Sequence, residues 1–298
     1  MEALIVPSLG SSSATLVAMT ETALSHNYLS KLSVSVVLYR GNLDHLRATL
    51  CGVRDAIVPS LQEARVYVVD QSLDDAYSTD SRALCTQIFE EAPVAWEYLK
   101  LDHNAGYGAG HNAVLQRDLG EYHLILNPDV ELPTNWLADS LAFLDAEPDI
   151  VLFATRGKNS QGEEEYLAKR YPTVWVLLLR AFGVRWLKDR CKEQLDHYEM
   201  RDLSTQPVAH DVPLLSGCCL LARTDALRAV RGFDERFFLY FEDYDLAMRM
   251  RDLGRVVRFG ALQFVHHGGK ASKKGWRHIL WFTRGGVRFF SRWGWRWV

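Results

Sequence analysis

The sequence has little of what membrane-spanning or secreted proteins carry. No apolar run approaches the ~18 residues of a transmembrane helix, and Glu2 stands where a signal peptide would have basic residues. Cysteine is sparse as well: the five cysteines in 298 residues are odd in number and match no metal-ligand spacing. We therefore expect reduced thiols and a cytoplasmic protein without a signal peptide.

Acidic residues are absent from the end of the chain. From Lys270 onward there are eight Lys or Arg residues and no Asp or Glu, although the whole chain has a net charge of −3. The preceding 269 residues therefore hold 26 basic against 37 acidic side chains, a net charge of −11. This contrast makes the tail a separate electrostatic unit, and the acidic remainder argues against nucleic acid as a partner.

Strand and helix patterns alternate four times in the first half of the chain. The composition, 48% apolar and 24% charged, is that of a globular enzyme with a large core. The alternation predicts an α/β fold with a mostly parallel, Rossmann-like central sheet flanked by helices. The predicted strands are Leu32–Tyr39, Ala64–Val69, Val94–Leu101 and Tyr122–Leu126, and the predicted helices are Asn42–Ala56, Ser81–Glu91, Gly110–Leu119 and Asn135–Leu144.

The second half is less regular. Ile150–Ala154 and Val212–Arg223 have the pattern of buried strands, the latter broken at Ser216–Gly217. We expect a polar loop at Arg156–Glu165. The apolar stretch Tyr171–Leu187 contains arginines and suits a core helix, a membrane-surface segment or an acceptor cleft, of which the core helix is the commonest outcome.

Polar side chains follow the ends of the predicted strands. Tyr39, Asp70, Asn104 and Asp129 all lie at or just beyond these ends. Because ligands of parallel α/β sheets bind beyond the carboxyl ends of the strands, the coincidence predicts a binding site. Two alternatives stay open: Asp70 is an ordinary turn residue, or Asp129 caps the helix predicted at Asn135–Leu144.

A glycine-rich loop, Asn104–Asn112 (NAGYGAGHN), leads into a predicted helix. Gly106, Gly108 and Gly110 would let the backbone approach a phosphate at the helix N-terminus. The loop resembles a dinucleotide fingerprint only loosely, because His111 replaces the last glycine and the third strand precedes it. This argues against a nicotinamide dehydrogenase.

Three carboxylates, Glu242, Asp243 and Asp245, follow an aromatic run within Phe237–Leu246 (FFLYFEDYDL). Carboxylates crowded against apolar side chains repel one another and lose hydration, so the pKa of at least one should rise. A general base that works near neutral pH needs such a pKa. The alternative is that Asp243 or Asp245 merely caps the helix predicted at Ala247–Gly254.

Two further features suit a divalent cation. Asp129 follows a proline that fixes its approach, and its carboxylate could hold an ion that bridges phosphates. His266 and His267 lie in an apolar segment flanked by glycine. They are either core residues or ligands for a manganese-type ion.

Taken in order, these pieces resemble the inverting family 2 glycosyltransferases with the GT-A fold, and among them the bacterial rhamnosyltransferases of cell-surface polysaccharide synthesis. The resemblance runs from about Ser33 to Phe290. The motifs that carry it are SVVLYR, VVDQS, NAGYGAGHN, NPDV, LLSGCCLLAR followed by GFDERFFLYFEDYDL, and HHGGKAS. Each motif is weak alone, but the ordered set is specific.

The resemblance implies a nucleotide-sugar site. Asp70 would hydrogen-bond the base, and Tyr39 with its strand end would form the rest of the base pocket. Asn104 and Gly106 would line the nucleotide-sugar site. Asn127, which replaces the first Asp of the family's Asp-x-Asp motif, is assigned to the same site.

The resemblance also implies the chemistry. Asp243 matches the catalytic base, and Asp245 and Glu242 would hold or tune it. Asp129 matches the last Asp of the metal-binding motif, and His266 matches a histidine that often completes the metal site, so Mg²⁺ or Mn²⁺ is the expected cofactor. The donor would be a nucleotide-sugar, best dTDP-rhamnose, and the acceptor a hydroxyl of a lipopolysaccharide, O-antigen or other surface glycan or glycolipid.

Two other classes of function stay open. A sugar nucleotidyltransferase shares the sheet, but its first strand should be followed by a Gly-rich loop with Arg or Lys, where this chain has only Tyr39–Asn42. A non-catalytic nucleotide-sugar-binding module would not need the three carboxylates at 242–245.

We expect three segments along the chain. Residues 1–30 are a lead-in with little pattern. Residues 31–269 would form the glycosyltransferase domain, with a nucleotide-sugar-binding half at 31–149 and an acceptor and catalytic half at 150–269. Residues 270–298 would be a basic, aromatic, helical tail.

The tail is predicted to have two faces. On a helix, four arginines that recur every four residues oppose a set of aromatic residues. Such a helix suits an anionic membrane, here the cytoplasmic face of the inner membrane, where a lipid-linked acceptor would be presented. The alternatives are a solvated basic face and aromatic side chains that pack on the catalytic domain. The arginines are Arg284, Arg288, Arg292 and Arg296, and the aromatic residues are Phe282, Phe289, Phe290, Trp293 and Trp297.

Overall fold

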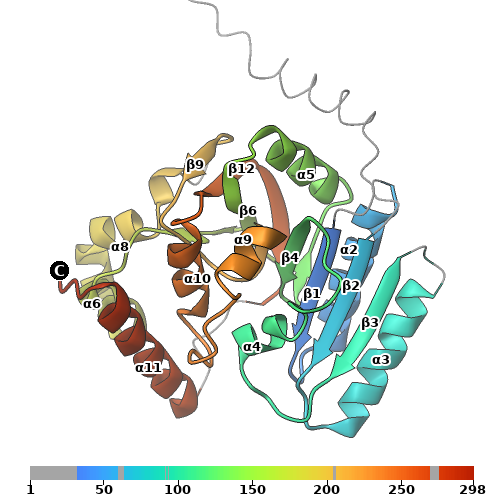
Figure 1. Ribbon diagram of the computed structural model, residues 1–298. Helices are drawn as coiled ribbons and strands as arrows, with labels where there is room; N and C mark the ends of the chain where they lie inside the picture. The colour runs from blue at the N-terminus through green and yellow to red at the C-terminus, as the bar shows by residue number, and fades with distance from the viewer. Residues whose placement is uncertain (1–31, 60–63, 91, 93, 204–205, 269–274) are drawn as a thin grey trace, which may run out of the picture.

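Figure 1 shows a computed structural model of the chain, which describes residues 32–268 and 275–298 apart from 60–63, 91, 93 and 204–205. The expected lead-in at 1–30 lies outside the described residues. Among the described residues, no helix combines the length and the apolar character that crossing a membrane requires.

Ten strands form one sheet in the order β3-β2-β1-β4-β11-β6-β12-β5, with β7 beside β6 and β9 beside β12. The first four strands in the chain run parallel, and β11 is antiparallel to both β4 and β6. Since β12 runs parallel to β6, six strands end at the same edge. Their bounds are β1 Leu32–Leu38, β2 Ala64–Asp70, β3 Ala95–Lys100, β4 Tyr122–Leu126, β6 Ile150–Asn159 and β12 Arg255–His266.

The shorter strands close the sheet and add a second one. In the main sheet they are β5 Val130–Glu131, β7 Glu164–Glu165, β9 Ala209–Asp211 and β11 Cys219–Arg223. A separate pair, β8 Ala168–Lys169 and β10 Leu214–Leu215, is antiparallel. The predicted α/β fold with a mostly parallel sheet is therefore confirmed. The sheet crosses the boundary expected at residue 149, because β4 of the first half pairs with β11 of the second.

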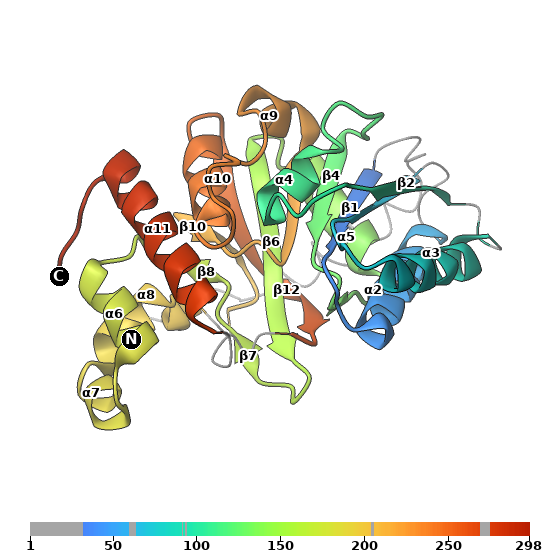
Figure 2. The same ribbon diagram turned by 90° about the horizontal axis from the view of Figure 1, so that it is seen from below.

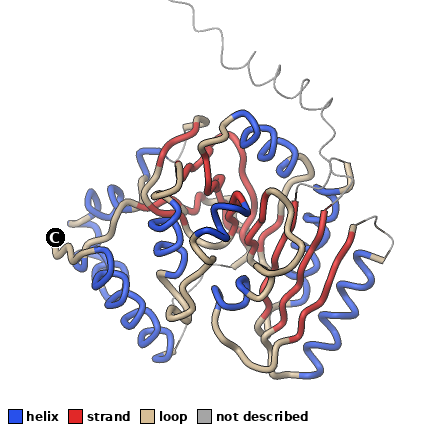
Figure 3. The backbone as a smooth tube through the Cα atoms, viewed as in Figure 1, coloured by secondary structure: helices blue, strands red, loops and turns tan. Residues whose placement is uncertain are grey.

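Helices cover both faces of the sheet (Figures 2 and 3). On one face Leu46 and Leu141 pack against Val34 and its neighbours, and on the other face Leu246 joins a second buried cluster. The first face carries α2 Leu43–Ile57, α3 Asp75–Phe89 and α5 Trp136–Ala146, and the second α4 Tyr107–Asn112, α9 Thr224–Ala229 and α10 Glu242–Met250.

Several predicted boundaries were wrong. The helix expected at Gly110–Leu119 begins at Tyr107 and ends at Asn112, and the helix expected from Ser81 begins at Asp75 because Asp74 caps it. The polar loop expected at 156–165 is mostly strand. There β6 continues to Asn159 because it pairs with β7 and β12, and such pairing satisfies polar backbone regardless of side-chain polarity.

A layer of helices lies beside the sheet (Figure 1). The stretch expected as one apolar helix at 171–187 forms two, separated at Gly183. Val176 and Leu177 are buried, so the prediction that this stretch packs in the core is confirmed for these two residues. The helices of this layer are α6 Val174–Phe182, α7 Arg185–Arg190, α8 Lys192–Tyr198, the 3-10 turn η1 Arg201–Leu203 and α11 Trp276–Trp293.

The tail forms the helix α11, and its aromatic face turns inward. Phe289 and Phe290 are buried in a cluster with Phe237 and Phe241. Phe282 and Trp293 pack against the same cluster, whereas Trp297 beyond the helix is 64% exposed. The expectation that these four helical aromatics face a membrane is therefore wrong. They hold α11 against the catalytic domain.

Candidate active site

Asp243 lies in the first turn of α10, directly after the aromatic run. The helix begins at Glu242, after Tyr240 and Phe241, which have left-handed backbone angles (φ 72° and 69°). One oxygen of Asp243 accepts a hydrogen bond from the backbone N–H of Gly217 (2.9 Å) and the other accepts from that of Tyr244 (2.8 Å). The side chain is half-buried, so it is held in place yet reachable.

Burial raises the pKa of two neighbouring carboxyls. The pKa of Asp243 rises to about 6, because desolvation outweighs its backbone hydrogen bonds. Desolvation and the charge of Asp243 raise the pKa of Glu242 well above its ordinary value, and Glu242 Oε2 is buried with no hydrogen-bond partner among the described residues. The predicted rise in pKa within this cluster is confirmed. With a pKa of about 6, Asp243 is mostly ionised near neutral pH, and the raised pKa of Glu242 favours the protonated form of that carboxyl.

Asp245 points elsewhere. It is fully buried and accepts hydrogen bonds from Arg249 Nε (2.7 Å), Arg292 Nη1 (3.1 Å) and Trp293 Nε1 (3.0 Å). Residues two apart on a helix point about 200° apart, so Asp245 fastens α11 to α10 on the side away from Asp243. The capping alternative is wrong, because the N-cap position belongs to Phe241.

The glycine-rich loop is tied to the same place. Asn104 Oδ1 accepts from the Gly106 N–H (3.0 Å), and Gln71 accepts from the Ala105 N–H and donates to the Gly106 carbonyl (both 2.9 Å). The Tyr107 hydroxyl donates to the carbonyl of Gly217 (2.5 Å), the residue whose N–H holds Asp243. Gly217 thus joins the predicted donor loop to the predicted base.

Gly106→Ala is expected to distort this loop. Gly106 has a φ of 102°, and an added Cβ would lie 2.9 Å from the Cα of Phe238. The free energy of unfolding should fall by about 1–3 kcal/mol, and nucleoside diphosphate affinity should fall with it, as denaturant titration and calorimetry would measure. Gly162→Ala is the matched control, because its φ is 79° but no described atom lies within 4 Å of its added Cβ. Equal losses in both variants would contradict a specific role for the Phe238 contact.

Asp70 is enclosed at the end of β2. Its side chain is fully buried, and hydrogen bonds outweigh burial to lower the pKa of its carboxyl. The ammonium group of Lys100 contacts this carboxylate, so the base of a nucleotide would have to displace Lys100 to reach Asp70. Tyr39, at the end of the neighbouring strand, is 52% exposed. The groups that donate to Asp70 are Ser72 N (2.8 Å), Ser78 Oγ (2.5 Å), Tyr98 Oη (2.9 Å) and Lys100 Nζ (3.1 Å).

Asn127 and Asp129 follow β4 at the same edge. Asn127 N–H donates to the Cys218 carbonyl (2.8 Å), next to Gly217. Asp129 lies 3.3 Å from His266 Nε2, and the other nitrogen of His266 bonds Glu165 (2.7 Å). Burial disfavours the imidazolium, but its hydrogen bonds to Asp129 and Glu165 outweigh burial and raise the pKa of His266 to about 9. The N-cap alternative for Asp129 is wrong, because Asn135 occupies the N-cap of α5.

The residues at this edge fit a divalent cation. No three His, Cys, Asp or Glu side chains in the described part of the chain gather as a metal site. However, Asn127 Oδ1 is buried with no hydrogen-bond partner among the described residues, and Asp129 Oδ1 is buried with His266 Nε2 3.3 Å away. Two buried oxygens beside a histidine ring suit Mg²⁺ or Mn²⁺. The Glu165–His266 pair has the form of a carboxylate that orients a histidine ligand.

Sequence reasoning missed four residues of this region. Gln71 and Tyr107 lie within the VVDQS and NAGYGAGHN motifs, but only the fold shows that they hold the glycine-rich loop in place. Glu165 fell in the predicted polar loop. Lys169 is buried near Asp243, where its charge lowers the pKa of the Asp243 carboxyl, while burial lowers the pKa of Lys169 itself to about 7. No sequence pattern pointed to Lys169.

Comparison with known proteins decides the family. The model of "Glycosyl transferase family 2" matches residues 33–231, well over half of the chain. The chain belongs to glycosyl transferase family 2. The resemblance inferred from the six motifs is therefore confirmed.

Known family members include rhamnosyltransferases. The chain is 30% identical over 186 residues to N-acetylglucosaminyl-diphospho-decaprenol L-rhamnosyltransferase of Mycobacterium tuberculosis, covering 55% of this chain and 56% of that protein. It is 24% identical over 218 residues to rhamnosyltransferase WbbL of Escherichia coli K12, covering 67% of this chain and 76% of that protein. The alignment with the mycobacterial relative thus spans little more than half of that protein's length.

A solved structure shares the GT-A fold. The mannosyltransferase PcManGT from Pyrobaculum calidifontis, in complex with GDP-Man and Mn²⁺, superposes with a TM-score of 0.55 at 15% identity. The match covers 93% of this chain and 74% of that one. At this identity the likeness concerns the fold alone.

Proposed function

We propose that the protein is an inverting glycosyltransferase that uses Asp243 as its general base. One observation carries the proposal. Asp243 is half-buried, has a pKa raised to about 6, and is joined through Gly217 to the loop expected to hold the donor. A base of this pKa is ionised at neutral pH and still accepts a proton effectively.

The remaining site residues have complementary roles in this proposal. Asn104 and Gly106 line the donor site, and Asp70 and Tyr39 bind the base of the nucleotide. The acceptor hydroxyl gives its proton to Asp243 as it attacks the anomeric carbon. This attack inverts the anomeric centre because it comes from the face opposite the nucleotide. A bound Mg²⁺ or Mn²⁺, held by Asn127, Asp129 and His266, would neutralise charge on the departing diphosphate.

The names of the relatives support a choice of substrates. Both curated relatives are rhamnosyltransferases, and the mycobacterial one is named for a sugar-diphospho-lipid acceptor. We therefore propose dTDP-rhamnose as the donor and a lipid-linked glycan that carries a diphosphate as the acceptor. Such an acceptor would bring the protein to the cytoplasmic face of the membrane.

The test is a screen of nucleotide-sugars with the purified full chain. Release of a nucleoside diphosphate that depends on added acceptor supports transfer. Release of inorganic pyrophosphate from a nucleoside triphosphate and a sugar phosphate would indicate a nucleotidyltransferase instead. Binding of nucleotide-sugars without turnover of any of them would indicate a binding module.

The rate of transfer should depend on pH through Asp243. The base works only when ionised, so kcat/KM should be constant above about pH 7 and fall about tenfold per pH unit well below pH 6. A profile from pH 5 to 8, with donor binding and thermal stability measured at each pH, would check this. A rate independent of pH down to 5 in the folded protein would contradict the assignment.

A further inference from the structure

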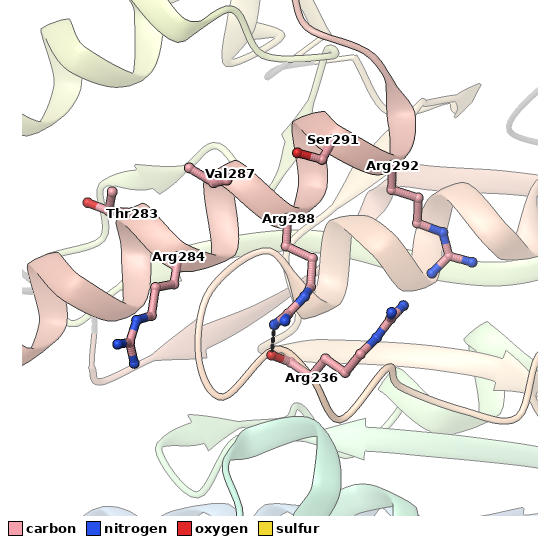
Figure 4. A pocket seen from close by; sticks show the side chains of 7 residues that line it. All are labelled: Arg236, Thr283, Arg284, Val287, Arg288, Ser291 and Arg292. Carbon is pink, nitrogen blue, oxygen red and sulfur yellow. Dashed lines mark hydrogen bonds between the residues drawn. The ribbon is translucent and has the colours of Figure 1, made fainter.

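A second concave site lies between α11 and the segment that leads into α10 (Figure 4). It has a volume of about 700 Å³ and contains no carboxylate among its lining residues. Arg284, Arg288 and Arg292 extend from one side of α11 toward the loop that carries Arg236. We call this site the arginine groove; the other residues that line it are Thr283, Val287 and Ser291.

The charges of the groove are only partly balanced. Arg236 pairs with Asp234 (2.5 Å), and Arg292 pairs with Asp234 (3.3 Å) and Asp245 (3.1 Å). Among the described residues Arg284 has no hydrogen-bond or ion-pair partner, and Arg288 donates to the backbone carbonyl of Arg236 rather than to a carboxylate. The four guanidinium groups of the groove therefore have only two carboxylate partners, and one of these, Asp245, is shared with Arg249. The excess of about two positive charges suits a dianion or trianion.

An exposed apolar stripe runs beside the arginines on α11. At about 100° per residue, Trp276, Leu280 and Val287 fall within about 40° of one another, next to Arg284. They are 71%, 37% and 49% exposed. Because Val287 also lines the groove, a ligand that joins an anion to a hydrocarbon chain would contact both features.

The groove adjoins the candidate active site. Arg236 lies six residues before Glu242, and Arg292 contacts Asp245 on the base helix. Phe238 packs on Trp281 of α11 (ring centroids 4.6 Å apart), and its carbonyl accepts from the Tyr107 N–H of the donor loop (3.1 Å). Arg236 and Phe238 therefore lie on one segment that links the groove to the donor loop, which Gly217 joins to Asp243.

We propose that the arginine groove binds the diphosphate of a lipid-linked acceptor, with the lipid along the exposed stripe of α11. This inference rests on the proposed function and names the part of the acceptor that is recognised. Guanidinium groups match phosphate oxygens in bidentate geometry. The anion is therefore a diphosphate held by Arg284 and Arg288, the two arginines of the groove that pair with no carboxylate in the described part of the chain.

Binding of inorganic pyrophosphate to the full chain, measured by calorimetry in EDTA, tests the groove. EDTA removes the ion that pyrophosphate would need at Asp129. Arg284→Ala combined with Arg288→Ala should weaken pyrophosphate binding at least about tenfold. Arg284→Glu alone should do the same, and it leaves the contact of Arg288 intact. Arg277→Ala, on an exposed part of the same helix outside the groove, is the control. Unchanged affinity in both groove variants would overturn the proposal.

Vesicles distinguish a lipid-linked diphosphate from a phospholipid headgroup. Neutral phosphatidylcholine vesicles would carry either polyprenyl diphosphate or phosphatidylglycerol at equal charge. The groove variants should lose binding to the first kind and keep any binding to the second. An equal loss on both kinds would show a general site for anionic headgroups and overturn the proposal.

Kinetics separates this inference from the proposed function. The groove variants should raise KM for an acceptor that bears a diphosphate and leave KM unchanged for the same saccharide without it. A protein inactive with every nucleotide-sugar, whose pyrophosphate binding still depends on Arg284 and Arg288, would refute the proposed function alone. An active enzyme whose KM values are the same in the wild type and in the groove variants would refute the proposal for the groove alone.

Discussion

Asp243→Asn is expected to lower kcat for transfer by about 10²–10⁴, the usual contribution of a general base. The affinity for the nucleotide should change little, because the amide has nearly the same shape and its oxygen still accepts one of the two backbone hydrogen bonds that hold Asp243. Single-turnover kinetics and calorimetry with the nucleoside diphosphate would separate these two quantities.

Loss of folding would not explain such a result. The pKa of Asp243 is higher in the folded protein, about 6 against 3.8, so ionisation costs stability as pH rises through this window. An asparagine has no such cost, so the melting temperature at pH 7 should not fall on this account. Asp252→Asn, an exposed Asp just beyond α10, is the matched control. A variant at position 243 that keeps transfer within about tenfold of the wild type would remove Asp243 from the mechanism.

The raised pKa within the carboxylate cluster could be predicted from the sequence because one of its causes is local. Glu242 and Asp243 are adjacent in the sequence and repel each other, and the aromatic run before them indicates a buried segment. The sheet could be predicted for a similar reason, since its apolar strands are continuous in sequence. The partners of Asp243 could not: Gly217 and Lys169 come from segments 26 and 74 residues away, and only the fold brings them together.

The tail shows a different limit. Helical periodicity correctly placed Phe289 and Arg288 on different sides of one helix, but it does not say which side meets the protein. The answer depends on Asp245, a buried carboxylate of another helix that bonds both Arg292 and Trp293. Once the aromatic side is packed, the arginine side faces the groove. Because Asp245 lies outside the tail, the helical pattern of the tail could not predict that its aromatic side chains are buried.

Asp129→Ala is expected to abolish the contribution of Mn²⁺ or Mg²⁺ to nucleotide binding. The change removes one of the two buried oxygens after β4, which belongs to the carboxylate beside His266. Loss of a residue that only orients a metal ligand typically costs 10–100-fold in affinity, so loss of a ligand should weaken dTDP binding in Mn²⁺ by at least about tenfold. Calorimetric titration of dTDP with Mn²⁺ and with EDTA measures the effect. Asp118→Ala, at an exposed carboxylate, is the control.

Asn127→Asp is the reciprocal test of the same ion. It adds the carboxylate that the Asp-x-Asp motif would have, at an oxygen that is already buried and has no hydrogen-bond partner among the described residues. If that oxygen faces the cation, the variant should bind dTDP more tightly in Mn²⁺ than the wild type does, and less tightly in EDTA, where two carboxylates repel each other and the diphosphate. Wild-type affinity that is the same in Mn²⁺ and in EDTA would show the metal assignment to be wrong. The amide of Asn127 would then be the physical reason, since one carboxylate and a protonated His266 attract no cation.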